Sequence, residues 1–169
     1  MKAFGTLIMI LGALALTSCD NTPVINVQRD VADDYKENMI NANKVIAQSE
    51  HTQIQSYIER RGWKMTQLSN GEWMEEYHKG TGSAISYEDS CHVRYRLEAL
   101  NGKIIYDGQE ESFVVGRNQT TVGLDRAVME LHRGSKARII APSDLGYGVA
   151  GDGDRVPSRT VLIYDIEVL

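Results

Sequence analysis

Apolar and polar residues alternate in several segments of the C-terminal hundred residues. In 91–99 every second residue is apolar and the residues between them are polar, which is the period of a strand with one buried face. Asn101-Gly102 follows directly and favours a tight hairpin into a strand at 103–107. The same alternation recurs at 135–141 and 162–168. These patterns predict antiparallel strands with one face in the core and one in solvent.

One segment between the strands has the helical period instead. It consists of four apolar residues followed by a glycine suited to end a helix: Leu124, Ala127, Val128, Leu131 and Gly134. Ahead of it, Phe113 and Val115 predict another short strand. One short helix against a strand-rich sheet is an α+β architecture. By strand parity, the helix-facing side carries Tyr95 and Tyr164, and an aromatic residue at such a position is by default a core residue.

The segment 30–62 predicts one or two amphipathic helices. It contains no proline or glycine before Gly62, and its apolar residues recur near helical spacing among polar ones. The apolar stripe is thin, which is typical of a helix that packs against a neighbouring surface. That surface is either the C-terminal domain of the same chain or a second copy, so a homodimer formed through 30–62 is one of two open alternatives.

Residues 1–18 have the organisation of a secretory signal peptide. Lys2 precedes an uncharged apolar stretch from Ala3 to Leu16, which is shorter than the roughly 20 residues that a membrane-spanning helix needs. Leu16-Thr17-Ser18-Cys19 resembles the bacterial lipobox, and this resemblance implies cleavage before Cys19 and lipidation of its thiol and amine. We therefore expect a lipid-anchored protein of the bacterial cell envelope, with 19–29 as a tether.

Charge and composition exclude several classes of function. The chain has 18 Lys and Arg against 23 Asp and Glu, and this net charge of −5 makes nucleic acid an improbable partner. Of the two cysteines, Cys91 is expected to be a small core residue. The four histidines lack the spacing of metal ligands, and 151–154 lacks the carboxylate pattern of a calcium loop, so this segment predicts a flexible hairpin tip. We expect no metal and no cofactor.

The order of motifs over residues 63–169 resembles the FKBP-type peptidyl-prolyl cis/trans isomerases, including envelope lipoproteins of Bacteroidetes. The most specific blocks are Leu145-Gly146-Tyr147-Gly148 and the C-terminal Tyr164-Asp165-Ile166-Glu167-Val168-Leu169. Others in the same order are Val93-Arg94-Tyr95, Asn101-Gly102, Tyr106-Asp107, Phe113-Val114-Val115-Gly116, Gly123-Leu124 and Val156-Pro157. The resemblance implies a curved antiparallel sheet wrapped around one short helix, with a substrate pocket between them.

The resemblance also implies the residues of that pocket. Catalytic roles fall to Tyr95, to Tyr147, whose hydroxyl would hold the substrate carbonyl, and to Asp107 as a buried carboxylate. The implied substrate-binding residues are Tyr106, Glu111, Phe113, Thr120, Thr121, Leu124, Val156 and Tyr164.

This sequence departs from the family pattern at several pocket positions. Leu124 stands where the family has an aromatic floor and Glu111 where it has Phe. Thr120-Thr121 replace a Val-Ile pair, and Tyr106 and Tyr164 stand at Phe positions. We therefore expect a pocket that is less dry than usual and isomerase activity that is real but weak. Because Glu111 shares strand parity with Phe113, it is expected on or beside the pocket, where it would favour a basic residue next to proline.

Two hypotheses from different classes follow. The first is a membrane-tethered isomerase that assists the folding of proline-containing secreted or envelope proteins. The second is a binding module of the same fold, a weakly active or inactive chaperone or partner-binding lipoprotein.

Overall fold

The computed structural model describes residues 27–169 of the chain. The expected signal peptide 1–18 and the lipidation site Cys19 lie outside the described residues, as does most of the tether. The chain divides into two units between Asn38 and Met39. None of the helices in the described part of the chain combines the length and the apolarity that crossing a membrane requires.

The N-terminal helical segment is a single helix, α1 (Val27–Arg61). Gly62 ends it with a φ of +66°, a left-handed conformation that glycine adopts without strain. Within the unit 39–169, the last turns of α1 bury Ile54, Tyr57 and Ile58 in a cluster with residues of the sheet. This part of α1 therefore packs on the domain of its own chain.

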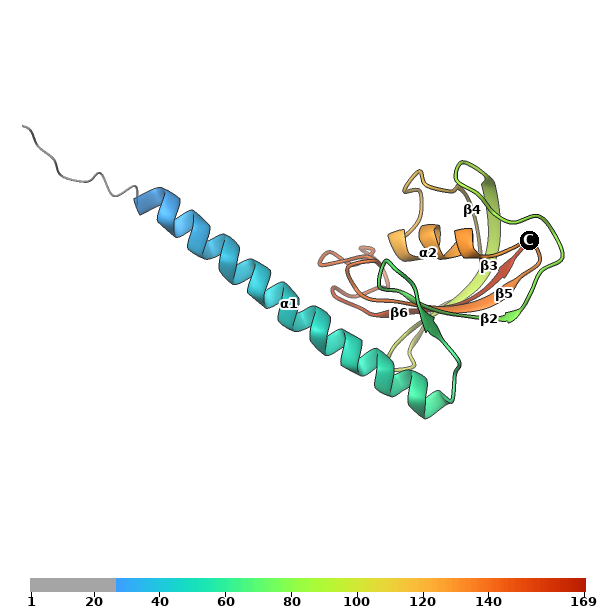
Figure 1. Cartoon of the computed structure of the whole chain (residues 1–169), viewed down its shortest axis with the longest axis horizontal. Coiled ribbons are helices and arrows are strands. Elements are labelled where there is room, and N and C mark those ends of the chain that lie inside the picture. Colours follow the sequence, from blue (N-terminus) through green and yellow to red (C-terminus); the bar gives the residue numbers. More distant parts are fainter. Residues whose placement is uncertain (1–26) are drawn as a thin grey trace, which may run out of the picture. The chain divides into compact units, whose positions relative to one another are not determined.

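Six antiparallel strands form one sheet in the order β1-β2-β5-β6-β3-β4 (Figure 1). The strands are β1 (Thr66–Gln67), β2 (Trp73–His78), β3 (Ser90–Ala99), β4 (Ile104–Val114), β5 (Lys136–Ala141) and β6 (Leu162–Val168). The short helix α2 (Val122–Ala127) continues as a 3₁₀ turn, η1 (Val128–Glu130), and lies on one face of the curved sheet (Figure 1). The predicted α+β architecture is confirmed.

The alternation in β5 and β6 gives the sheet two buried faces. Ile139 and Tyr164 belong to the main core that contains α2, whereas their neighbours Ile140 and Ile163 belong to the cluster under α1. Successive side chains of a strand point to opposite faces, so these four residues occupy both sides of the sheet. The sequence pattern predicted the first face, and the burial of Ile140 on the second was missed.

Two sequence expectations need correction. The separate strands expected at 103–107 and around Phe113 are one strand, β4, because the chain continues past a bulge. At the bulge the pairing shifts between Tyr95 opposite Gln109 and Leu97 opposite Tyr106, and Gly108 takes a φ of +69°. The predicted helix is also shorter than its pattern, since η1 tightens the turn well before Gly134.

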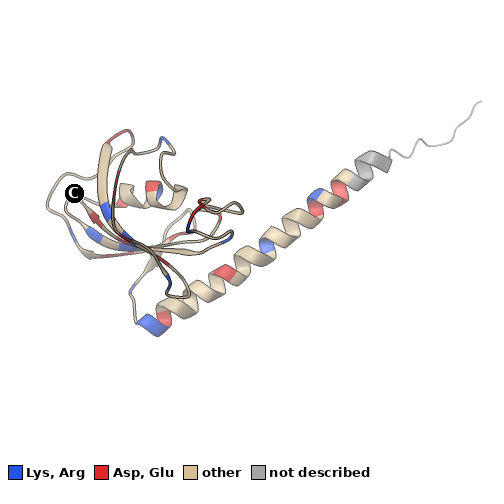
Figure 2. Ribbon diagram, turned by 180° about the vertical axis from the view of Figure 1, so that it is seen from behind, with Lys and Arg blue, Asp and Glu red and all other residues tan. Residues whose placement is uncertain are grey.

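The part of the sheet face that α1 leaves uncovered is charged. Figure 2 shows that residues of both charge signs alternate along the strands. Their side chains form ion pairs, Arg94 with Glu110 at 2.6 Å and Arg138 with Glu75 at 3.2 Å. The Arg138 guanidinium also lies 5.0 Å from the centre of the Trp63 ring. Exposed pairs of this kind contribute little stability each, and here they leave no large unbalanced charge on this face.

Candidate active site

Four tyrosines define the candidate site, on the face of the sheet that α2 covers. Tyr95 comes from β3, Tyr106 from β4 and Tyr164 from β6, while Tyr147 belongs to the loop after β5. The rings of Tyr95 and Tyr164 meet edge to face, with centroids 5.5 Å apart and planes at 70°. Tyr106 and Tyr147 are partly buried and pack against the same core. We call these four residues the tyrosine cluster.

Tyr164 connects the cluster to the start of α2. Its hydroxyl shares a hydrogen bond of 2.9 Å with the Thr121 hydroxyl, and Thr121 caps α2 by accepting from the Leu124 amide at 3.4 Å. Burial raises the pKa of Tyr164 well above its ordinary value, because the phenolate would lose its hydration. The hydroxyl therefore stays protonated, and the bond fixes the helix start relative to β6.

Glu111 places a carboxylate beside these hydroxyls. It pairs with Val93 across β3 and β4, so it shares the core-facing side with Tyr95. The pKa of Tyr95 is raised first by burial and then by the charge of Glu111, and the pKa of Tyr147 is raised for the same two reasons in the same order. A negative charge next to several phenols keeps all of them protonated and able to donate a hydrogen bond.

Tyr106 joins the cluster to the loop before β6. Its hydroxyl donates to Asp152 Oδ2 at 2.8 Å. Asp152 Oδ1 accepts from the amides of Asp154, Arg155 and Val156 at 2.9, 2.8 and 2.7 Å. Although desolvation opposes ionisation, these bonds lower the pKa of Asp152 to about 2. One carboxylate thus organises the turn that carries Val156 into the core.

Asp152 and Arg155 were missed as site residues. The Arg155 guanidinium lies 5.2 Å from the centre of the Tyr106 ring, so a positive charge borders the cluster on this side. The sequence of 151–154 predicts a flexible tip, whereas the structure holds this turn through Asp152. The Asp152-Gly153-Asp154 sequence does indicate an ordered turn, since an aspartate side chain readily accepts hydrogen bonds from the amides that follow it.

Asp107 is not buried, which corrects the expectation of a buried catalytic carboxylate. It is exposed at the bulge of β4 and lines a depression of about 230 Å³ together with Tyr95, Arg94, Arg96 and Lys136. The bulge at Gly108 turns this part of the strand outward. The carboxylates beside the tyrosine cluster are instead those of Glu111, next to Tyr95 and Tyr147, and of Asp152, bonded to Tyr106.

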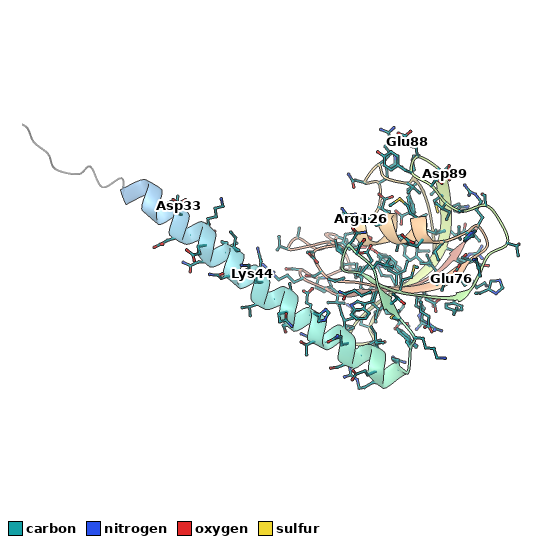
Figure 3. The ribbon with its side chains drawn as sticks, viewed as in Figure 1. Asp33, Lys44, Glu76, Glu88, Asp89 and Arg126 are labelled. Atoms are coloured by element: carbon teal, nitrogen blue, oxygen red, sulfur yellow. The ribbon has the colours of Figure 1, made fainter. Side chains whose placement is uncertain are left out.

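The remaining predicted residues differ in their exposure. Leu124 has no exposed surface, and Phe113 and Val156 are 3% and 4% exposed, so all three form core around the cluster. Thr121 is buried at the helix cap, and Thr120 before it is half-buried. Arg126, on α2, is exposed (Figure 3). The structure therefore brings together the four tyrosines, Glu111 and Thr121, and exposes Asp107 at the surface beside Tyr95.

The chemistry available at the cluster is that of hydrogen bonding and packing. The Tyr164 and Tyr106 hydroxyls are engaged with Thr121 and Asp152, so the donor for a carbonyl oxygen is the hydroxyl of the half-buried Tyr147. The half-buried rings of Tyr106 and Tyr147 offer flat apolar surface to a five-membered ring. Among residues 27–169, no group of three His, Cys, Asp or Glu side chains is arranged to hold a metal ion.

Comparisons with known proteins agree with this geometry. Residues 82–169 match the family model described as FKBP-type peptidyl-prolyl cis-trans isomerase. A probable FKBP-type 25 kDa peptidyl-prolyl cis-trans isomerase of Pseudomonas aeruginosa is 27% identical over 111 residues, which are 66% of this chain and 48% of that protein. FK506-binding protein 4 of Rhizopus delemar is 28% identical over 109 residues, 63% of this chain and 28% of the relative. The chain thus spans less than half the length of both relatives.

Solved structures show the same fold. A peptidyl-prolyl cis-trans isomerase from Pseudomonas syringae superposes with a TM-score of 0.63 at 28% identity, over 75% of this chain and 92% of that one. FkpA from Escherichia coli gives a TM-score of 0.62 at 22% identity, over 85% of this chain and 68% of its own, and this likeness concerns the fold alone.

Proposed function

Because the chain belongs to the FKBP-type peptidyl-prolyl cis-trans isomerase family, we propose that it catalyses rotation about X-Pro peptide bonds at the tyrosine cluster. The observation that carries the proposal is the convergence of Tyr95, Tyr147 and Tyr164, from two strands and a loop, on one core-facing site. Such a site suits a substrate whose reacting group is a tertiary amide on an apolar ring.

Cis/trans rotation about the X-Pro bond requires no nucleophile, and no covalent bond is broken. Rotation crosses a barrier near 20 kcal/mol because the C–N bond has partial double-bond character. A twisted amide has lost this resonance and part of its carbonyl dipole, so an aromatic site favours it over the planar ground state. The Tyr147 hydroxyl would hold the substrate carbonyl, and its raised pKa keeps the donor proton in place. Each tenfold acceleration requires about 1.4 kcal/mol of such preference.

Glu111 would determine the substrate class. Its carboxylate lies beside the tyrosines and forms no ion pair with the described side chains, so a basic residue next to the substrate proline would complete one. At a partly exposed position this interaction is worth about 1 kcal/mol, or about fivefold in kcat/KM. We propose X-Pro segments with a lysine or arginine beside proline as the preferred substrates.

The clients would be unfolded or nascent envelope proteins. This rests on the lipobox-like Leu16-Thr17-Ser18-Cys19, which would tether the chain to a membrane of the bacterial envelope. The alternative of a partner-binding protein with little catalysis is favoured by one observation: Met39, Ile40 and Val45 of α1 expose apolar side chains, 44%, 45% and 70% accessible.

The test is cis/trans exchange of short X-Pro peptides with X as Lys, Leu or Glu, using the full chain in mild detergent. Tyr95→Ala and Tyr147→Phe should remove most of the acceleration. Tyr87→Phe makes the same change at a tyrosine that is 62% exposed, and should leave the rate unchanged. A folded protein that accelerates none of these peptides would refute catalysis and favour the binding role.

A second pair of variants tests the substrate class. Glu111→Gln should abolish the preference for X as Lys over Glu while retaining the rate for Leu. Glu110→Gln removes the neighbouring charge, which pairs with Arg94 on the opposite face of β4, and should retain the preference. Equal loss of preference in both variants would indicate a long-range charge effect and refute a specific role of Glu111.

A further inference from the structure

A buried ion-dipole contact connects α1 to the loop that carries Tyr147. Glu50 on α1 is 7% exposed, and both of its carboxylate oxygens bond to one residue. Oε1 accepts from the Ser143 hydroxyl at 2.5 Å, and Oε2 accepts from the Ser143 amide at 2.9 Å. A largely buried carboxylate with both oxygens bonded is strongly held, because breaking either bond leaves one oxygen without its protein partner.

Ser143 in turn organises the loop around Tyr147. Its carbonyl accepts from the Gly148 amide at 2.8 Å and, at 3.3 Å, from the Gly146 amide, which the Pro142 carbonyl shares at 3.1 Å; Gly146 and Gly148 flank Tyr147. The Leu145 carbonyl accepts from the Gly123 amide at 2.8 Å and so connects the same loop to α2. Fixing Ser143 therefore fixes the backbone on both sides of Tyr147.

Little else from α1 supports this loop. The preceding turns of α1 face it across a cavity of about 390 Å³ that Asn43, Ile46 and Ala47 line on the helix side and Val149 on the loop side. Glu50 and Ser143 line the same cavity. One turn after Glu50, Ile54 begins the apolar contact between α1 and the sheet. The Glu50 carboxylate thus lies between the part of α1 that packs on the sheet and the part that borders the cavity. At this position hydrogen bonds, rather than apolar contacts, connect α1 to the domain.

We propose that Glu50 is a positioning residue for isomerisation, acting through Ser143 to hold the Tyr147 hydroxyl where the substrate carbonyl binds. The proposal rests on the proposed function for its effect on rate, whereas its effect on the loop can be measured without it. It makes α1 part of the active-site scaffold, so that a partner bound to α1 would alter turnover by moving Glu50.

The kinetic test is a double-mutant cycle in the full chain. Glu50→Ala should lower kcat/KM by roughly tenfold, because a small displacement of a positioned donor loses most of its contribution. In the Tyr147→Phe background the same substitution should cost less than about twofold, since the hydroxyl that Glu50 positions is absent. Glu50→Gln should restore most of the rate, because its amide can accept from the Ser143 amide and donate to the Ser143 hydroxyl.

Glu59→Ala is the matched control, since Glu59 is an exposed glutamate of the same helix. Its rate should equal that of the unmodified chain. If Glu50→Ala costs the same factor with and without the Tyr147 hydroxyl, Glu50 acts elsewhere and the proposal is wrong. Should Glu50→Ala not fold, Ser143→Ala, which removes only the 2.5 Å bond, takes its place in the cycle with a smaller loss.

Amide hydrogen exchange separates this inference from the proposed function. Glu50→Ala should accelerate exchange at Ser143, Gly146 and Gly148 at least about tenfold, while amides of β3 keep their protection. This result supports the positioning of the loop even if the protein proves inactive on X-Pro peptides. Unchanged protection at these three amides would overturn the proposal whatever the activity.

Discussion

Replacing Ile54 with alanine measures how firmly α1 is anchored to the sheet. Ile54 has no exposed surface and lies in a cluster of buried side chains, Ile54, Tyr57, Ile58, Ile140, Val161 and Ile163. Deleting three carbons from such a position costs about 2–5 kcal/mol through lost burial and the cavity left behind. Trp63 and Leu100 at the edge of this small cluster can relax into the space, so we expect about 3 kcal/mol, within that range.

Chemical denaturation followed by tryptophan fluorescence is a direct assay. The chain has two tryptophans, and both Trp63 and Trp73 pack against this cluster. Ile54→Ala should move the midpoint to lower denaturant, by an amount that the slope of the transition converts to free energy. A shallower slope in the variant would mean that α1 detaches before the sheet unfolds.

Ile40→Ala is the matched control, because it makes the same change in the same helix at a side chain that is 45% exposed. At low protein concentration it should alter the stability by less than about 0.5 kcal/mol. If the two variants lose the same stability, or if Ile54→Ala loses less than about 1 kcal/mol, α1 is not anchored as described and the inference about Glu50 loses its support.

Four further outcomes are expected. Asp107→Asn should leave kcat/KM for X-Pro peptides within about twofold of the unmodified chain, because the Asp107 carboxylate is exposed to solvent rather than buried among the tyrosines; a tenfold loss would assign it a role in the site. Thr121→Val should lower the free energy of unfolding by about 1–2 kcal/mol, since the buried Tyr164 hydroxyl loses its partner and the Leu124 amide its cap, and a denaturant titration of the variant checks this. The pKa of Asp152 is depressed to about 2, so its contribution to stability is present above the ordinary value of 3.8 and should be lost between about pH 4 and pH 2; acid titration of the Asp152→Asn variant should lack this step. If α1 forms a homodimer, light scattering should report a dimer that Ile40→Glu dissociates, and a monomer at all concentrations would exclude it.

The alternation of apolar and polar residues was sufficient to predict which side chains of the regular strands are buried. The alternation in 91–99 assigned Tyr95 to the buried face, and the one in 162–168 did the same for Tyr164; the structure brings their rings to 5.5 Å. Parity works here because a one-residue shift would bury charges such as Arg94 and expose apolar side chains. The same rule placed Glu111 on the core-facing side, although the residue type alone favours solvent.

Parity fails where the strand is irregular. At Asp107 the extra residue of the bulge changes which side the chain presents, and Gly108 is the only local sign of it. The buried Asp107 that the family resemblance implies is therefore wrong for a local reason, because the residue lies in the bulge. A glycine inside an alternating segment indicates a possible bulge, and beyond it the two-residue period no longer predicts which side chains are buried.

Contacts between distant segments had no sequence signal at all. Glu50 and Ser143 are 93 residues apart in the sequence. The sequence around each predicts an ordinary surface residue, a glutamate in a polar helix and a serine in a turn. Their burial follows only from the packing of Ile54 and its neighbours, which brings that face of α1 to the edge of the sheet where β5 ends. The hydrophobic pattern therefore fixes where α1 lies, and the polar pair then determines how closely the Tyr147 loop follows it. A protein that keeps the isomerase motifs but changes this pair should retain the fold and differ in the rate.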